Sequence, residues 1–193
     1  QTELTTDQAK AMIKDLADYG APVILFSGGE PLLRQDLPEL IRTATSSGLR
    51  AVISTNGTLI TQGMAQVLGD MGLSYIGVSL DGLAAVNDRF RGVDGAFAMA
   101  LSGIKNAMEA GIKVGLRFTM NKRNVSEIPR IFDLMEEQEI PRICFYHLVY
   151  TGRGSALKDE DLSHEQTRAT LDLIMDRTRA MLDKGLNVEV LTV

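Results

Sequence analysis

The fold is decided by the stretch Val23-Ile24-Leu25-Phe26-Ser27-Gly28-Gly29-Glu30-Pro31. Its first four residues have the length and β-rich composition of a buried strand, and the two glycines end that strand at once. Because Gly28 and Gly29 lack a Cβ atom, the backbone can take positive φ angles there and a ligand can approach it closely. Glu30 adds a carboxylate, which only accepts hydrogen bonds and suits a ligand ammonium group. The alternative is a plain strand-to-helix turn with a solvated glutamate.

The composition is typical of a soluble globular protein. The chain has 193 residues, of which 45% are hydrophobic and 23% charged, so it forms one large domain over residues 1–193 or a piece of a bigger protein. Its net charge of −5 argues against a nucleic-acid partner. No apolar stretch reaches the roughly 18 residues of a membrane span, and no signal peptide opens the chain. With the single cysteine, Cys144, these features predict a cytoplasmic protein without an internal disulfide or a membrane partner.

Apolar strand runs alternate with amphipathic helical patterns along the chain. The strand runs begin near residues 23, 51, 75, 112 and 142, with one helix between each pair, and a last strand covers Leu186–Val193. Capping-box sequences at Thr5–Gln8 and Ser163–Gln166 predict where the first and last helices begin. The alternation indicates parallel strands joined by right-handed crossovers.

Side-chain alternation within the strands favours a barrel over a doubly wound open sheet. In the run 75–81, apolar residues alternate with Gly77, Ser79 and Asp81, and the run 112–120 alternates in the same way. One face is therefore apolar enough to pack against helices, while the other becomes polar towards the carboxyl end of the strand. With five such barrel strands after a helical start, we expect an incomplete barrel that lacks one strand upstream.

Polar residues gather at the carboxyl ends of these strands, where ligand sites of α/β proteins form. Asp81 could accept hydrogen bonds from a ribose diol, and Ser79 and Arg91 could hold a carboxylate. The alternatives are that Asp81 belongs to a simple turn and that Arg91 is a solvated surface residue.

Arg117, Tyr146 and His147 are further candidates. The alternation turns Arg117 inward, and a buried arginine needs an anionic partner, which could be a ligand or a structural ion pair. Tyr146 and His147 end the last barrel strand, and the alternation does not tell which one faces inward; His147 could be an acid, a base or a ligand-binding group, or a structural residue. Cys144 lies in mid-strand and is expected in the core. With two histidines and one cysteine in the chain, we predict no metal ligands.

Three motifs together resemble the radical S-adenosylmethionine superfamily, whose core is a partial (β/α)6 barrel of the TIM type. They are Phe26-Ser27-Gly28-Gly29-Glu30-Pro31-Leu32, Ser54-Thr55-Asn56-Gly57 and Ser79-Leu80-Asp81-Gly82, in that family's order and spacing. The resemblance covers nearly the whole chain and implies an α/β fold, a partial barrel incomplete at its N-terminal strand. It also implies a role in binding S-adenosylmethionine for seven residues: Gly28, Gly29 and Glu30 at the methionyl amine, Ser79 and Arg91 at the carboxylate, and Asn56 and Asp81 near the ribose.

The chain departs from this family in one respect. The family binds a [4Fe–4S] cluster through a CxxxCxxC loop between its first strand and first helix, and we expect this chain to begin at that helix. The cluster ligands would then lie outside this sequence, and the 193 residues alone would be inactive. The resemblance also implies an electron donor such as a flavodoxin or a ferredoxin.

Within the superfamily, the stretch Cys144–Gly154 resembles the tetrapyrrole branch, whose members complete heme d1 or heme b by altering propionate side chains. The resemblance implies an enzyme that acts on a tetrapyrrole through a 5′-deoxyadenosyl radical, with a possible second cluster in a C-terminal extension. Arg117 and Arg153 suit a polycarboxylate, and His147 or Tyr146 could donate a proton or anchor the substrate. Two alternatives stay open: a radical peptide-modifying maturase, and a cluster-less barrel that binds a small molecule without catalysis.

Overall fold

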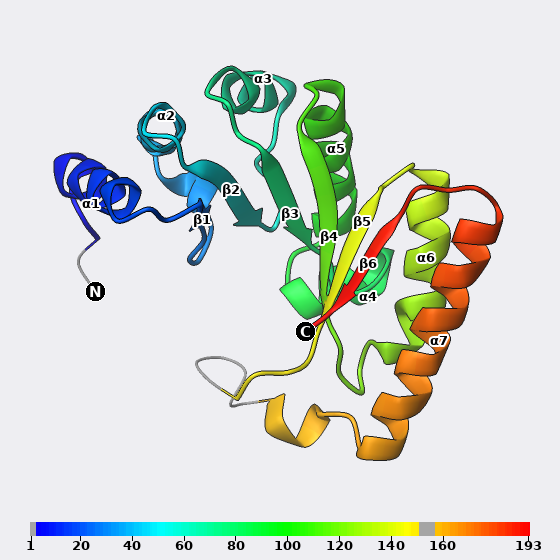
Figure 1. The fold of residues 1–193 in the computed structure, drawn as a ribbon. Coiled ribbons are helices and arrows are strands. Elements are labelled where there is room, and N and C mark those ends of the chain that lie inside the picture. Colours follow the sequence, from blue (N-terminus) through cyan, green and yellow to red (C-terminus); the bar gives the residue numbers. More distant parts are fainter. Residues whose placement is uncertain (1–2, 151–156) are drawn as a thin grey trace. The chain divides into compact units, whose positions relative to one another are not determined.

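The computed structural model describes residues 3–150 and 157–193 of the chain (Figure 1). Within these residues the chain forms seven α-helices and six strands. It divides into two compact units, one made of residues 1–78 and 99–114 and the other of residues 79–98 and 115–193. None of the described helices is long and apolar enough to cross a membrane.

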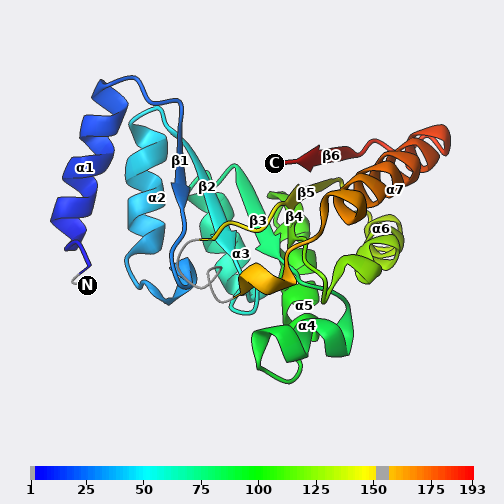
Figure 2. The same ribbon diagram turned by 90° about the horizontal axis from the view of Figure 1, so that it is seen from below.

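The first unit contains the first three strands. They are β1, Val23–Phe26; β2, Arg50–Thr55; and β3, Tyr75–Ser79, whose last residue belongs to the second unit, and each pairs in parallel with the next. Its helices are α1, Thr6–Asp18; the 3₁₀ turn η1, Pro31–Leu33; α2, Leu37–Ser46; α3, Gln62–Asp70; and most of α5, Ala96–Glu109. α1 and α2 lie side by side next to β1 (Figure 2).

The second unit contains the last three strands. They are most of β4, Lys113–Thr119; β5, Arg142–Tyr146; and β6, Glu189–Thr192. β5 pairs in parallel with both β4 and β6. The helices are α4, Ala84–Arg91; the 3₁₀ turn η2, Val125–Glu127; α6, Ile128–Glu137; and α7, His164–Asp183. α6 and α7 pack side by side (Figure 1, Figure 2).

The strands are parallel and follow the chain order from β1 to β6 in the sheet, which confirms the predicted α/β class. The expected count of five parallel strands is wrong. The final strand, predicted over Leu186–Val193, forms as β6 and pairs in parallel with β5, with Val190 opposite Ile143. Because α7 returns the chain to the end at which β5 starts, this strand joins the sheet in the same direction as the others.

The capping boxes place the first and last helices where the sequence predicts. The Thr5 hydroxyl accepts a hydrogen bond from the Gln8 amide at 3.3 Å, and the Gln8 side chain accepts one from the Thr5 amide at 2.9 Å. Ser163 and Gln166 make the same reciprocal pair at 3.2 and 2.9 Å. Each box satisfies two of the backbone donors that a helix start leaves without an intrahelical partner, so these boundaries follow from local sequence.

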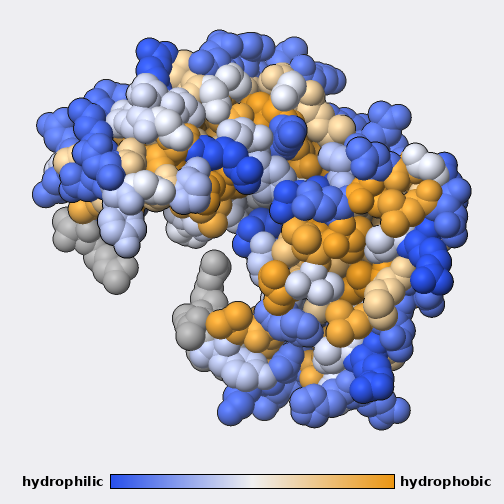
Figure 3. Space-filling model, in the orientation of Figure 1, coloured by the Kyte–Doolittle hydropathy of each residue, from blue (hydrophilic) through white to orange (hydrophobic). Residues whose placement is uncertain are grey.

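Aromatic rings form much of the core of the second unit. Phe118 of β4 packs edge-on against Phe145 of β5, with ring centroids 5.8 Å apart, and Phe132 of α6 stacks on Phe145 at 5.7 Å. All three side chains are fully buried. Packing is less complete at β6, whose residues are exposed or half-buried, and Figure 3 shows hydrophobic surface in this region.

Gly103 lets α5 approach the loop that follows β2. A Cβ atom built on Gly103 would lie 2.2 Å from the Gly57 carbonyl oxygen and 3.1 Å from the Ile60 Cβ, so no larger residue fits. One turn further along α5, the Asn106 side chain donates a hydrogen bond to the Ile60 carbonyl at 2.8 Å. This close packing fixes the loop that begins with Asn56, one of the predicted ligand-binding residues.

The substitution Gly103→Ala should therefore lower the free energy of unfolding by about 1–3 kcal/mol, because the added methyl group forces helix and loop apart. Gly63→Ala is the matched control, because no atom lies within 4 Å of its Cβ position. Since Gly63 is in the first turn of α3, that change should leave the free energy of unfolding within about 0.5 kcal/mol of wild type. Denaturant unfolding of the full protein measures both, and equal stability of wild type and Gly103→Ala would contradict the close packing.

Candidate functional site

In the first unit, the Glu30 carboxylate is fixed where β1 and β2 end. One oxygen, Oε1, accepts hydrogen bonds from the Leu32 amide at 3.2 Å and the Thr55 hydroxyl at 2.6 Å, and Oε2 accepts one from the Asn56 amide at 2.9 Å. A carboxylate has about four acceptor positions, so it can still accept a hydrogen bond from a ligand. Glu30 is thus half-buried and held in place, unlike the solvated turn residue of the alternative interpretation.

The glycines beside Glu30 leave one wall of a cavity bare. The cavity has a volume of about 550 Å³ and is lined by the segment from Phe26 to Pro31 and by residues of α1 and α2. Gly28 has a φ of +138°, a backbone conformation that side-chain-bearing residues rarely adopt, and nothing lies within 4 Å of the Cβ positions of Gly28 and Gly29. The positive φ predicted for this turn is thus found at Gly28, and the backbone is open at both glycines, while ligand binding there stays a prediction.

An arginine–aspartate pair fixes the start of α1, which lines the same cavity. The Arg34 guanidinium donates two hydrogen bonds to Asp36, from Nε at 2.7 Å and from Nη2 at 2.9 Å. Arg34 also donates to the Leu4 carbonyl at 3.1 Å, and the Thr6 hydroxyl donates to Asp36 at 2.6 Å. The charged hydrogen bonds from Arg34 hold the pKa of the Asp36 carboxyl below its ordinary value.

The Asn56 side chain forms a turn of its own. Its Oδ1 accepts hydrogen bonds from the Thr58 amide at 2.8 Å and the Thr58 hydroxyl at 2.7 Å. The backbone amide of Asn56 already donates its hydrogen bond to Glu30. The side-chain NH₂ group of Asn56 is therefore the donor that could still bind a ligand.

In the second unit, Ser79, Asp81 and Arg91 come together at the end of β3. Arg91 Nη2 lies 2.6 Å from Asp81 Oδ2 and donates a hydrogen bond to the Ser79 carbonyl at 3.2 Å. Asp81 is only 6% exposed, and within the described residues its Oδ2 accepts no well-directed hydrogen bond. Burial raises the pKa of the Asp81 carboxyl and outweighs the opposing effect of Arg91. A buried oxygen with an unmet hydrogen bond suits a hydroxyl-bearing ligand.

The sequence did not predict α4, the helix that carries Arg91. Asn87 of this helix is buried and accepts a hydrogen bond from the Asp81 amide at 3.0 Å. Asp88 accepts hydrogen bonds from the Gly95 and Phe97 amides at 2.8 and 2.7 Å, which ties α4 to the start of α5. The helix has eight residues and only one of them is buried, so it shows no apolar periodicity. The one local signal was a glycine, residue 92, which ends the helix in the left-handed conformation.

Arg117 packs on Tyr146. Its guanidinium carbon lies 4.4 Å from the centre of the tyrosine ring, and the side chain is half-buried as the alternation predicts. No carboxylate of the described residues pairs with Arg117, so the structural ion pair that the sequence left open is not found there. β5 ends at Tyr146, and His147 is exposed and donates its amide hydrogen to the Val193 carbonyl. Tyr146 is thus the member of the pair that faces Arg117, and Arg153 lies outside the described residues.

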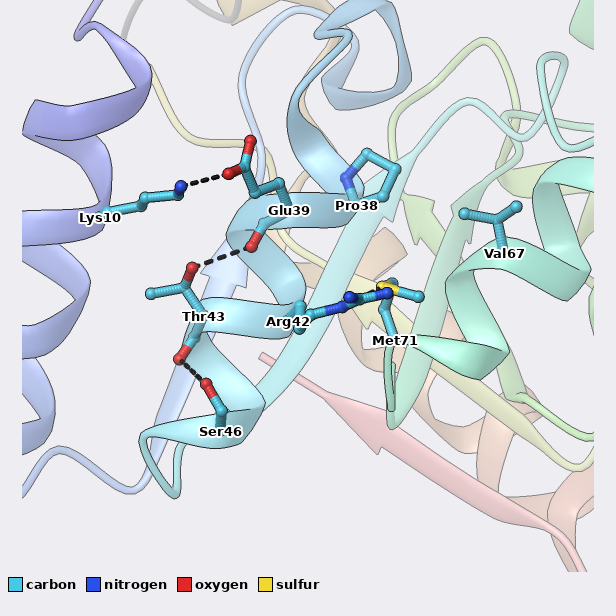
Figure 4. Close-up of a pocket in the computed structure, with 8 residues that line it drawn as sticks. All are labelled: Lys10, Pro38, Glu39, Arg42, Thr43, Ser46, Val67 and Met71. Carbon is cyan, nitrogen blue, oxygen red and sulfur yellow. Dashed lines mark hydrogen bonds and ion pairs between the residues drawn. The ribbon is translucent and has the colours of Figure 1, made fainter.

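A second cavity involves none of the predicted residues. It has a volume of about 580 Å³ and lies among α1, α2 and α3 (Figure 4). Lys10 and Glu39 form an ion pair across it, and Arg42 Nε lies 3.0 Å from the sulfur of Met71. Its polar groups are already paired and do not point to a common position, so they do not form a recognisable binding or catalytic site.

The part of the chain that the structure describes contains no group of three or more His, Cys, Asp or Glu side chains that could hold a metal ion. Cys144 is buried and free, as predicted for a core residue. Iron–sulfur clusters of the [4Fe–4S] type are held by several cysteine thiolates, so the described residues do not fit such a cluster.

Comparisons with known proteins agree with the motifs. The sequence model of the Radical SAM superfamily matches residues 1–135. The chain is 62% identical over 193 residues to the Fe-coproporphyrin III synthase of Methanosarcina barkeri, covering 100% of this chain and 48% of the relative. It is 39% identical over 191 residues to the pre-heme d1 synthase of Dinoroseobacter shibae, covering 98% and 47%. The chain therefore spans about half the length of these relatives.

A solved structure confirms the fold class. Streptococcus suis SuiB bound to S-adenosylmethionine matches with a TM-score of 0.82 at 18% sequence identity, over 100% of this chain and 45% of SuiB. At this level of identity the likeness concerns the fold alone.

The substitution Asp81→Asn tests the cost of the buried carboxylate. Because burial raises the pKa of Asp81 in the folded protein above its value in the unfolded chain, the folded state binds a proton more tightly, and ionised Asp81 opposes folding at neutral pH. We expect the variant to be at least as stable as wild type at pH 7. The difference in stability between the variant and wild type should become smaller as the pH falls towards the ordinary pKa of aspartate, about 4, because Asp81 of wild type then takes up a proton.

Thermal unfolding of both full-length proteins between pH 7 and pH 4 makes this comparison. A variant that is less stable than wild type at pH 7 and recovers on acidification would show that Arg91, and not burial, dominates at Asp81.

Proposed function

Because the chain belongs to the radical SAM superfamily, we propose that the protein containing it is a radical SAM enzyme of heme biosynthesis, which alters propionate side chains of a tetrapyrrole. The observation that carries this substrate class is Arg117. It is a half-buried cation without a carboxylate partner among the described residues, at the carboxyl end of a strand, and so it suits an anionic substrate. The names of the two relatives, an Fe-coproporphyrin III synthase and a pre-heme d1 synthase, support the same class.

Seven residues are our candidates for contacts with S-adenosylmethionine. In the first unit, Glu30 would accept from its methionyl ammonium group, and Gly28 and Gly29 would let it approach the backbone. In the second unit, Ser79 and Arg91 would hold its carboxylate. Asn56 and Asp81 would lie near the ribose hydroxyls. The supporting observation is that Asp81 Oδ2 is buried beside Arg91 but accepts no well-directed hydrogen bond among the described residues.

Bound S-adenosylmethionine would supply the radical chemistry that breaks a carbon–hydrogen bond of the substrate. The superfamily also implies a [4Fe–4S] cluster, for which the described residues supply no ligand set. The part of this chain is to bind and orient cofactor and substrate and to exclude water, because the hard chemistry belongs to the cofactor.

Arg117 would bind a propionate of the tetrapyrrole. With the guanidinium over the ring of Tyr146, the N–H groups at its edge can donate to a carboxylate in the plane of the guanidinium. Tyr146 would then anchor the substrate or donate a proton, and His147 is the exposed alternative for the same role. An electron donor such as a flavodoxin or ferredoxin would complete the system.

Replacing Glu30 by alanine in the full protein should weaken S-adenosylmethionine binding by about 1–3 kcal/mol, because the ligand ammonium loses its charged acceptor. Calorimetric titration under anaerobic conditions measures the affinity. The matched control is Glu39→Ala, which removes an exposed carboxylate of the same unit that pairs with Lys10 (Figure 4). Unchanged affinity in a folded Glu30→Ala protein would remove Glu30 from the site.

The substitution Arg117→Ala should weaken binding of iron coproporphyrin III by about 1.5–3 kcal/mol, the range for losing a hydrogen bond between charged groups. Titration followed by porphyrin absorbance measures it. Arg123→Ala, which removes an exposed arginine paired with Glu160, is the control and should bind as wild type does.

The methyl ester of the porphyrin separates charge recognition from ring packing. Wild type and Arg117→Ala should bind the ester equally, because it offers no carboxylate. If the intact protein ignores every porphyrin but binds a precursor peptide, the maturase interpretation replaces this one; if it binds neither S-adenosylmethionine nor porphyrin, the enzyme interpretation fails.

A further inference from the structure

The loop after β3 carries Asp81 and has most of its backbone donors in use. Three of the four N–H groups of residues 80–83 donate hydrogen bonds. They go from Leu80 to the Arg117 carbonyl at 3.0 Å, from Asp81 to Asn87 Oδ1 at 3.0 Å, and from Leu83 to Glu127 Oε2 at 3.1 Å. Two of these acceptors are side chains, so the position of the loop depends on side-chain placement.

Glu127 is the acceptor that comes from furthest along the chain. It lies in η2, in the crossover that follows β4, and 44 residues separate it from Leu83. The residue is 8% exposed, and burying a carboxylate is costly unless it is hydrogen-bonded. Its other partner, Arg130 at 3.2 Å, has a side chain that is 60% exposed, so this ion pair is largely solvated. The half-buried Leu83 amide is therefore the less solvated partner of Glu127.

The stem of Glu127 also packs against the loop. A Cβ atom on Gly82 would lie 2.6 Å from Val86 Cγ1 and 3.3 Å from Glu127 Cγ. Gly82 of the loop is thus packed closely against both the first turn of α4 and Glu127. A shift of Glu127 would leave both the amide of Leu83 and the space beside Gly82 without support.

We propose that Glu127 is a positioning residue for the S-adenosylmethionine site, acting by holding the loop that orients Asp81. Two backbone amides anchor the chain at Asp81: its own amide, which donates to Asn87, and the amide of Leu83, which donates to Glu127. The Asp81 carboxylate lies 2.6 Å from Arg91. Loss of the anchor at Leu83 would let the loop move and displace the Asp81 oxygen. The inference rests on the proposed function, which assigns Asp81 and Arg91 to the cofactor.

Two conservative variants separate hydrogen bonding from charge. Glu127→Gln removes the charge but keeps an acceptor oxygen at the same distance from the backbone. The variant should therefore bind S-adenosylmethionine with an affinity within about twofold of wild type, and its Leu83 amide should stay protected from hydrogen exchange. Glu127→Asp keeps the charge but withdraws the acceptor by one methylene, so it should lose about five- to tenfold in affinity, the loss expected for one hydrogen bond. Arg130→Ala is the control and should leave the affinity unchanged.

The affinity is measured by anaerobic titration of the full protein, and the anchoring by hydrogen exchange of the peptide that spans residues 80–83, without ligand. Faster exchange and weaker binding in Glu127→Asp, with both restored in Glu127→Gln, would support the proposal. A larger loss of affinity in Glu127→Gln than in Glu127→Asp would overturn the proposal, because the charge of residue 127 and not the position of its acceptor oxygen would then matter.

Wild-type affinity in Glu127→Asp would also overturn it, and a loss in Glu30→Ala measured alongside would show that the proposed function stands. If wild type itself binds no S-adenosylmethionine, the proposed function and this inference fail together.

Discussion

Backbone N–H groups at the carboxyl ends of parallel strands need acceptors, and buried or half-buried side chains supply them in each unit. A strand that ends inside a protein leaves donors that neither the sheet nor water satisfies. Here Glu30 accepts from Asn56 beside β2, and Asn87 and Glu127 accept from Asp81 and Leu83 after β3. Each of these acceptors is itself buried or half-buried, so the loops have few alternative conformations.

The same constraint explains why polar groups at this end of the strands can serve a ligand. Glu30 is oriented by three donors before any ligand arrives, so binding costs little further ordering. Asp81 differs from Glu30 in this respect, because its Oδ2 is buried next to Arg91 and accepts no well-directed hydrogen bond among the described residues. We expect such a group to destabilise the folded protein, which is common for polar groups retained for function.

The alternation of side chains along β4 and β5 determines which residues are buried in the core and which face the other side of the strands. Phe118 and Phe145 point into the core and pack with Phe132, so their neighbours Arg117 and Tyr146 must point to the other face. The guanidinium carbon of Arg117 then lies over the tyrosine ring, 4.4 Å from its centre. Arg117 is the cation that we propose for a propionate of the tetrapyrrole.

The sequence by itself determined the strands, the two capped helices, the parallel class and the motif residues, because periodicity, caps and turns are read from residues close in the chain. It did not determine the partners of those residues. That Arg91 pairs with Asp81, that Tyr146 and not His147 meets Arg117, and that Glu127 holds Leu83 from 44 residues away became known only from the tertiary structure. Such contacts depend on how the crossovers pack, and short polar segments such as α4 carry no periodic pattern that would show their place in that packing.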